Sequence, residues 1–211
     1  MANATESQGA PQIRVWDRFV RVFHWALVAA FTAAYFLSED ETLTLHTWAG
    51  YTVATLVLAR IVWGFIGPRH ARFADFLYRP KTSLSYFKNL LLFRAQRYVG
   101  HSPAGGTMVI ALLISLLLTT FSGMAYYGTR AETDGIATFV SRKVIGLEPV
   151  APALYKGTMR DRGDHDVKEL HETFANITII LIFAHIGGVV LASFAHRENL
   201  ARSMVTGDKR R

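Results

Sequence analysis

Four blocks of apolar residues run through the chain, and each is long enough to cross a bilayer as a helix. They cover about residues 17–37, 46–66, 108–126 and 170–194. A membrane-crossing helix needs about 20 largely apolar residues. The pattern therefore predicts an all-α integral membrane protein, a four-helix bundle in a single domain over residues 13–200. Outside the spans we expect a disordered N-terminus at 1–12, a long loop at 127–169 and a basic tail at 201–211.

The composition supports a membrane domain and narrows its chemistry. Of the 211 residues, 51% are hydrophobic, and the mean hydropathy is +0.21. The chain has no cysteine, which excludes disulfides, cysteine-ligated zinc or iron–sulfur sites, and covalently attached c-type haem. The formal charge is +7, but the basic residues flank the apolar blocks. We therefore expect membrane lipid, and no nucleic acid, as a partner.

The distribution of Lys and Arg predicts the orientation. The N-terminal region, the 67–106 loop and the tail together carry fifteen of the 23 basic residues, whereas the acidic turn at 38–42 carries none. The positive-inside rule places both termini and the 67–106 loop in the cytoplasm. The 127–169 loop, with seven acidic and seven basic residues, then faces the periplasm. The predicted location is the inner membrane of a bacterium.

The last span carries two histidines, His171 and His185, which are fourteen residues apart. On a helix this separation is about 21 Å along the axis and nearly four full turns, so both imidazoles leave the same face. One helix thus offers two ligands at two depths. The predicted topology matches each with a histidine on another span: His24 lies at the cytoplasmic depth of His185, and His46 at the periplasmic depth of His171.

Two histidine pairs in an apolar bundle without cysteine favour bis-histidine haem. A single buried histidine such as His24 could equally be a proton relay or make an interhelical hydrogen bond. A histidine-based ion transporter is a further alternative, although the span interiors lack carboxylates. Haem propionates need cations, and Arg18 and Arg60 lie at the cytoplasmic edge. Both could instead extend to lipid phosphate.

Several motifs together resemble one family. They are VWDRFVRVFHW at 15–25, WGFIGPRHARF at 63–73, GHSPAGG at 100–106, HETFAN at 171–176 and HRENL at 196–200. The chain resembles the bacterial di-haem cytochrome b561 group, which includes the b-type cytochrome subunits of nickel–iron hydrogenases. Ser102 stands where the group usually has Asn. The resemblance implies two non-covalent haem b groups, with His24 and His185 ligating the inner iron and His46 and His171 the outer iron.

The resemblance also implies a function in the respiratory chain. Members of this group pass electrons between a periplasmic donor, such as a cytochrome c or a hydrogenase-like complex, and the membrane quinone pool. The quinone site is not defined by spacing; the inner loop with Arg69, His70, His101 and Ser102 is one candidate. An alternative is a superoxide oxidase, an enzyme that passes an electron from superoxide to quinone. The acidic outer turn, Glu39 to Glu41, is unfavourable for an anionic substrate.

Overall fold

The structure is a computed structural model that describes residues 12–38, 43–130 and 159–210. Most of the predicted N-terminal stretch, four residues of the acidic turn and the central part of the 127–169 loop lie outside the described residues. The predictions made for those segments stay predictions.

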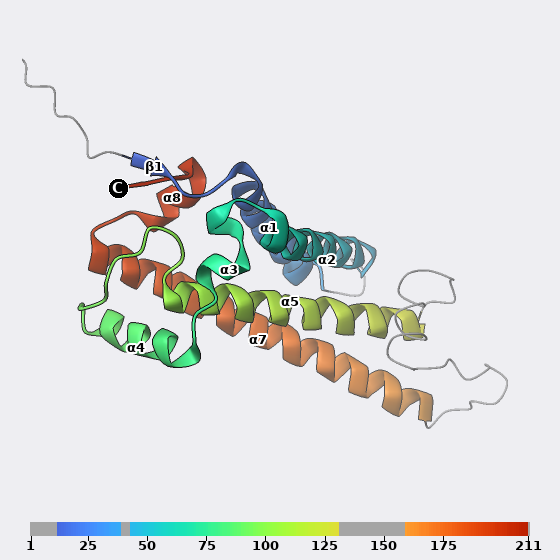
Figure 1. Cartoon of the computed structure of the whole chain (residues 1–211). Helices are drawn as coiled ribbons and strands as arrows, with labels where there is room; N and C mark the ends of the chain where they lie inside the picture. Colours follow the sequence, from blue (N-terminus) through green and yellow to red (C-terminus); the bar gives the residue numbers. More distant parts are fainter. Residues whose placement is uncertain (1–11, 39–42, 131–158, 211) are drawn as a thin grey trace, which may run out of the picture. The chain divides into compact units, whose positions relative to one another are not determined.

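Four long helices dominate the described part of the chain (Figure 1). They are α1 (Arg18–Phe36), α2 (Leu43–Ile66), α5 (Pro103–Arg130) and α7 (Met159–His196). Each contains a segment long and apolar enough to cross a membrane. The prediction of an all-α protein with four membrane-crossing helices is confirmed.

Short elements connect and extend these helices. They are β1 (Gln12–Arg14), the 3-10 helix η2 (Arg69–Ala71), α3 (Phe73–Phe76), α4 (Pro80–Leu91), α8 (Leu200–Thr206) and β2 (Asp208–Arg210). The tail is therefore not a simple basic extension. It forms α8 and then β2, which pairs antiparallel with β1.

Three of the long helices begin earlier than the apolar pattern indicates: α2 at Leu43 and, by a wider margin, α5 and α7. α5 begins at Pro103, because the Ser102 hydroxyl accepts a hydrogen bond from the backbone N–H of Gly105 at 3.2 Å and so caps the helix. α7 begins at Met159, inside the stretch predicted as a polar loop. Its polar first turns carry ion pairs one turn apart, such as Lys168 with Glu172 at 3.5 Å.

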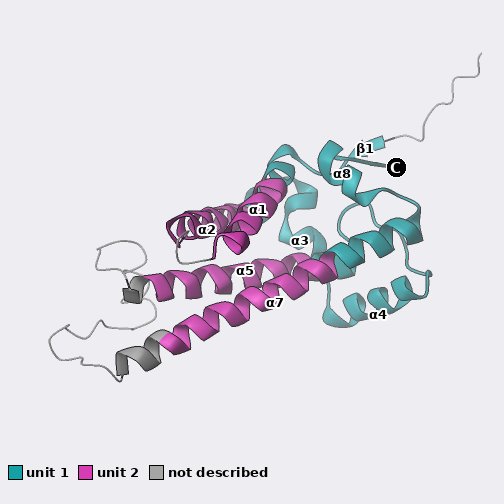
Figure 2. Cartoon of the chain, turned by 180° about the vertical axis from the view of Figure 1, so that it is seen from behind, with its two compact units in different colours: residues 1–22, 63–107, 186–211 teal, residues 23–62, 108–185 magenta. Residues whose placement is uncertain are grey.

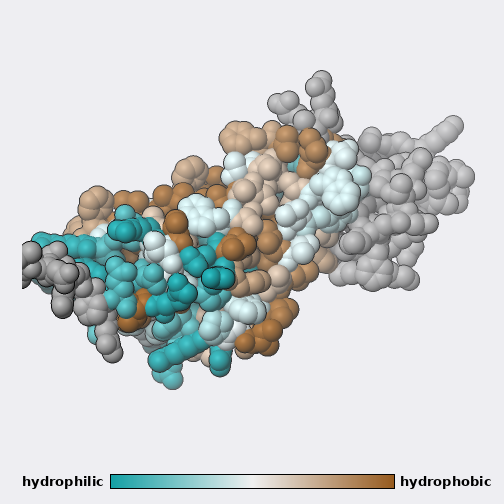
Figure 3. Space-filling model, turned by 90° about the horizontal axis from the view of Figure 1, so that it is seen from above, coloured by the Kyte–Doolittle hydropathy of each residue, from teal (hydrophilic) through white to brown (hydrophobic). Residues whose placement is uncertain are grey.

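The surface of the long helices is apolar. Large side chains such as Phe36, Phe65 and Phe194 are 75%, 71% and 73% exposed. In the space-filling view, apolar side chains form much of the visible surface beside a polar area (Figure 3). Exposed apolar area on this scale marks a surface that is covered in the cell. On membrane-crossing helices, lipid is the natural cover.

The chain divides into two compact units (Figure 2). Unit 1 comprises residues 1–22, 63–107 and 186–211, and unit 2 comprises residues 23–62 and 108–185. Unit 2 holds the greater part of α1, α2 and α5 and the part of α7 up to His185. In this unit α5 and α7 run side by side, as both ribbon views show (Figures 1 and 2).

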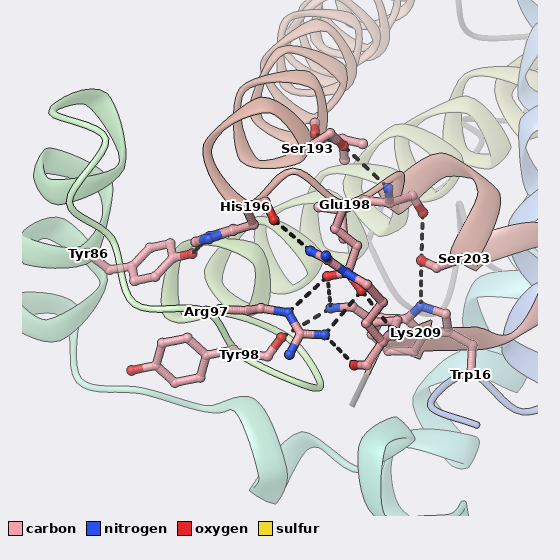
Figure 4. Close-up of polar contacts among 12 residues, drawn as sticks. Trp16, Tyr86, Arg97, Tyr98, Ser193, His196, Glu198, Ser203 and Lys209 are labelled. Atoms are coloured by element: carbon pink, nitrogen blue, oxygen red, sulfur yellow. Dashed lines mark hydrogen bonds and ion pairs between the residues drawn. The ribbon is translucent and has the colours of Figure 1, made fainter. Parts of the chain in front are cut away.

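In unit 1 the two ends of the chain meet as the β1–β2 pair. Next to it lies a buried cluster of charged side chains, Arg97, Glu198 and Lys209 (Figure 4). Glu198 accepts two hydrogen bonds from Arg97, at 3.1 and 3.2 Å, and lies 3.9 Å from Lys209. Burial alone would raise the pKa of the Glu198 carboxyl, but the bonds from Arg97 and from the Arg210 backbone, with the nearby cations, lower it. Burial lowers the pKa of Lys209. Gly207, at φ 91°, ends α8 in the left-handed conformation.

Candidate functional site: two pairs of histidines

Four histidines of unit 2 meet as two pairs. The ring centroids of His24 on α1 and His185 on α7 are 6.5 Å apart. Those of His46 on α2 and His171 on α7 are 6.1 Å apart. α7 is continuous from Met159 to His196, so it contributes one imidazole to each pair. The structure thus brings together the same partners that the predicted topology matched by depth.

The spacing within each pair suits two imidazoles on opposite sides of one metal ion. A metal–imidazole bond is about 2.0–2.1 Å long and the nitrogen lies about 1.1 Å from its ring centre, which gives centroids about 6.3 Å apart. The two observed separations, 6.5 and 6.1 Å, lie on either side of this value. The rings are inclined by 54° and 88°, which rotation about the metal–nitrogen bonds permits. A haem supplies the remaining ligands from its macrocycle, so the residues fit this group.

The His46–His171 pair is held by backbone carbonyls. Nδ1 of His46 lies 2.8 Å from the carbonyl oxygen of Ala34, and Nδ1 of His171 lies 2.9 Å from that of Thr119. A carbonyl can only accept, so each Nδ1 carries the proton and each Nε2 keeps its lone pair. Hydrogen bonds of this kind fix the tautomer and ring direction of metal-ligating histidines. Both imidazoles are therefore prepared to ligate through Nε2.

A glycine lets α5 approach His171. A Cβ atom at Gly123 would lie 2.9 Å from Cε1 and 3.1 Å from Nδ1 of the His171 ring. Gly123 follows Thr119 by four residues, one helical turn, so the missing side chain opens the way to the Thr119 carbonyl. Gly50, one turn after His46, is different: a Cβ there would meet nothing within 4 Å. The space beside Gly50 is therefore open, whereas Gly123 leaves room for the His171 ring itself.

The His24–His185 pair has different surroundings. Nδ1 of His24 is buried and has no hydrogen-bond partner among the described residues. A buried polar atom of this kind is costly unless a bound group completes its site.

Arg60, which is 2% exposed, follows His46 by fourteen residues on α2, just as His185 follows His171 on α7. Because α2 and α7 run in the same direction in unit 2 (Figures 1 and 2), Arg60 lies at the level of this pair.

The other polar residues named in the sequence analysis are either exposed to solvent or in contact with nearby side chains. Arg18 is exposed. His70 lies 2.9 Å from the carboxylate of Asp75, which also pairs with Arg69. His101 packs between the rings of Trp16 and Phe76, at centroid distances of 4.6 and 4.4 Å. These contacts give the inner loop a defined structure and do not identify a quinone site.

Sequence reasoning missed the groups that hold the histidines. The Ala34 carbonyl carries no side-chain signal, although it lies in the last turn of α1, where carbonyls lack helical partners. The sequence does contain a signal for the groups on α5, a cluster of small and polar residues inside an apolar span: Thr119, Ser122 and Gly123. All three lie on α5 next to His171: Ser122 Oγ is 3.4 Å from Nδ1 of that histidine.

Four apolar helices that enclose two imidazole pairs define a class, the multi-pass membrane cytochromes of b type. Comparison with known proteins assigns the family. Residues 15–207 match the family described as "Prokaryotic cytochrome b561". The match covers most of the chain, so the protein belongs to this family and is a membrane b-type cytochrome of electron transfer. Membership implies b-type haem.

Curated relatives match over nearly their full length at low identity. The chain is 21% identical to the "Probable Ni/Fe-hydrogenase B-type cytochrome subunit" of Rhizobium leguminosarum bv. viciae, over 93% of this chain and 88% of that protein. It is 22% identical to the protein of the same name from Bradyrhizobium diazoefficiens, over 99% and 90%. The corresponding Azotobacter vinelandii protein is 23% identical, over 92% and 87%. No solved structure gives a significant match.

Proposed function

We propose that this protein carries electrons across the bacterial inner membrane, between a periplasmic redox partner and the membrane quinone pool, through two non-covalent haem b groups. His46 and His171 ligate the haem near the periplasm, and His24 and His185 ligate the haem near the cytoplasm. Both termini and the basic 67–106 loop lie in the cytoplasm. The partner is a cytochrome c or a hydrogenase-like complex; the names of the relatives favour the latter.

One observation carries this proposal: α7 supplies one histidine to each of two pairs whose ring spacing suits bis-imidazole ligation. Fourteen residues of helix separate the two positions by about 21 Å along the axis. This leaves a far shorter gap between the edges of two macrocycles. The arrangement supports a path through the membrane rather than a single isolated centre.

Each part of the chain has a separate task in this function. Haem iron supplies a reversible one-electron centre. The imidazoles hold it, and the apolar helices exclude water from it. The carbonyls of Ala34 and Thr119 orient the two histidines near the periplasm. Arg60, charged and buried at the level of the other pair, offers a cation for a propionate.

Absorption spectroscopy and a quinol assay test the proposal on the full-length protein. Purified protein should contain two acid-extractable haem b per chain and show b-type absorbance on reduction. In liposomes that contain a membrane-soluble quinol, that quinol should reduce both haems. Fewer than two haems per chain would contradict the site assignment. Two haems that exchange no electrons with quinol would refute the quinone part alone.

A further inference from the structure

A hydroxyl cluster lies inside unit 2, between α5 and α7. Thr178 is 0% exposed, and Ser115 and Thr119 are 5% and 8% exposed. Oγ1 of Thr178 lies 2.6 Å from Oγ of Ser115 and 3.0 Å from Oγ1 of Thr119. Oγ1 of Thr178 also donates to the Phe174 carbonyl at 2.8 Å. Each hydroxyl has one proton, and Oγ1 of Thr119 also lies 2.9 Å from the Ser115 carbonyl. Thr178 therefore accepts from the Ser115 hydroxyl, and the proton between Thr178 and Thr119 comes from either of these two hydroxyls.

The position of Thr178 relates the cluster to the histidine pairs. Thr178 lies seven residues after His171 and seven before His185. Seven residues are about 20° short of two helical turns, so Thr178 lies on the same face of α7 as both histidines, midway between them. The hydroxyl cluster is thus a buried polar contact between α5 and this face of α7.

Thr119 connects the cluster to His171. Its hydroxyl contacts Thr178, and its carbonyl accepts from Nδ1 of His171 at 2.9 Å. The register of α5 along α7 therefore decides whether this carbonyl reaches the imidazole. Resting on the proposed function, we infer that Thr178 is a positioning residue: through Thr119 it holds His171 in the tautomer and direction that ligate haem, and it thereby sets the potential of that haem.

The direction of the expected shift in reduction potential follows from the hydrogen bond between His171 Nδ1 and the Thr119 carbonyl. A donated Nδ1–H raises the basicity of the imidazole, and a more basic ligand favours ferric iron. Weakening the contact between Thr119 and His171 therefore raises the reduction potential of the haem between His46 and His171. The Thr119 carbonyl bonds to His171, so the haem proposed for the His24–His185 pair serves as an internal reference.

Two variants at one position test the inference on the full-length, haem-loaded protein. Thr178→Val keeps the shape and removes the hydroxyl, whereas Thr178→Ser keeps the hydroxyl. A redox titration monitored by absorbance should show one of the two potentials shifted upward in Thr178→Val and restored in Thr178→Ser, with the second potential unchanged. Thr55→Val is the matched control, because that exposed hydroxyl donates to the Tyr51 carbonyl of its own helix.

The outcomes separate the inference from the function on which it rests. If wild-type protein binds fewer than two haems, the proposed function fails. If wild type binds two haems and Thr178→Val titrates like Thr178→Ser, Thr178 is not a positioning residue. A Thr178→Val protein that shifts both potentials equally also contradicts the inference, because a general loosening of the fold would do that.

Discussion

The two histidine pairs are alike in spacing and different in what supports them. In the His46–His171 pair both Nδ1 atoms donate to backbone carbonyls, and Gly123 brings α5 against the ring. In the His24–His185 pair Nδ1 of His24 is buried without a hydrogen-bond partner in the described part of the chain, and a buried arginine lies at the same level. If each pair binds a haem, as we propose, these unlike surroundings would give the two haems different potentials.

The largest difference between the pairs should come from a side chain at Gly123. Gly123→Val forces a Cβ atom to within 2.9 Å of the His171 ring. Overpacking of this kind costs about 1–3 kcal/mol, and here the ring has to leave the Thr119 carbonyl. We expect the haem of the His46–His171 pair to be lost and the other to stay, measured as haem per chain. Gly50→Ala is the control, and it should keep both.

The second difference is in the potentials of wild-type protein. Because two carbonyls raise the basicity of His46 and His171, the haem proposed for this pair should be reduced at the lower potential. We expect at least a tenfold difference in the one-electron equilibrium, which is about 59 mV. A redox titration of His185→Ala, which leaves the His46–His171 haem, identifies which potential belongs to it. Equal potentials, or the reverse order, would show that these hydrogen bonds do not govern the difference.

Arg60 should act on the opposite pair, with a smaller effect. Arg60→Gln removes a buried positive charge at the level of His24 and His185. A cation favours the reduced haem, so the potential of the His24–His185 haem should fall while the other stays constant. The measurement is the same redox titration. Arg18→Gln, a change at an exposed position of α1, should shift neither potential; if both arginine variants behaved alike, Arg60 would have no special place at this site.

A substitution in unit 1 should leave the difference between the two histidine pairs unchanged. Glu198→Gln removes the carboxylate shared by Arg97 and Lys209, and we expect a loss of about 1–3 kcal/mol in stability at neutral pH. Because the folded pKa of Glu198 is lowered, its stabilisation is present above the pKa of an unfolded glutamate, about 4.3, and is lost as the pH falls below it. Thermal unfolding in detergent at several pH values should show the variant and wild type converging in acid, with both haems retained.

Much of the fold and the four histidines could be predicted, because the physics behind them is periodic. Apolar blocks of span length gave four helices, and the spacing of His171 and His185 placed two imidazoles on one face. The supporting groups could not be predicted in the same way. The Ala34 and Thr119 carbonyls act through the backbone, which every residue shares, and their use depends on how α1 meets α2 and α5 meets α7.

The structure formed by the two ends of the chain could not be predicted from the sequence either. The basic tail had no apolar periodicity that would predict α8, and the pairing of β2 with β1 joins residues nearly 200 positions apart. The sequence assigned Glu198 no structural role beyond its place in the HRENL motif at 196–200. Its role became visible only when Arg97, Lys209 and the Arg210 backbone were found around it.

Haem content in single histidine variants tests the central claim most directly, namely that each pair binds one haem. Full-length His24→Ala and His185→Ala should each keep one haem per chain with the same spectrum and potential. His46→Ala and His171→Ala should each keep the other haem, again with a common spectrum. If variants from different pairs lose the same haem, or if any of the four retains both haems with unchanged potentials, the pairing is wrong.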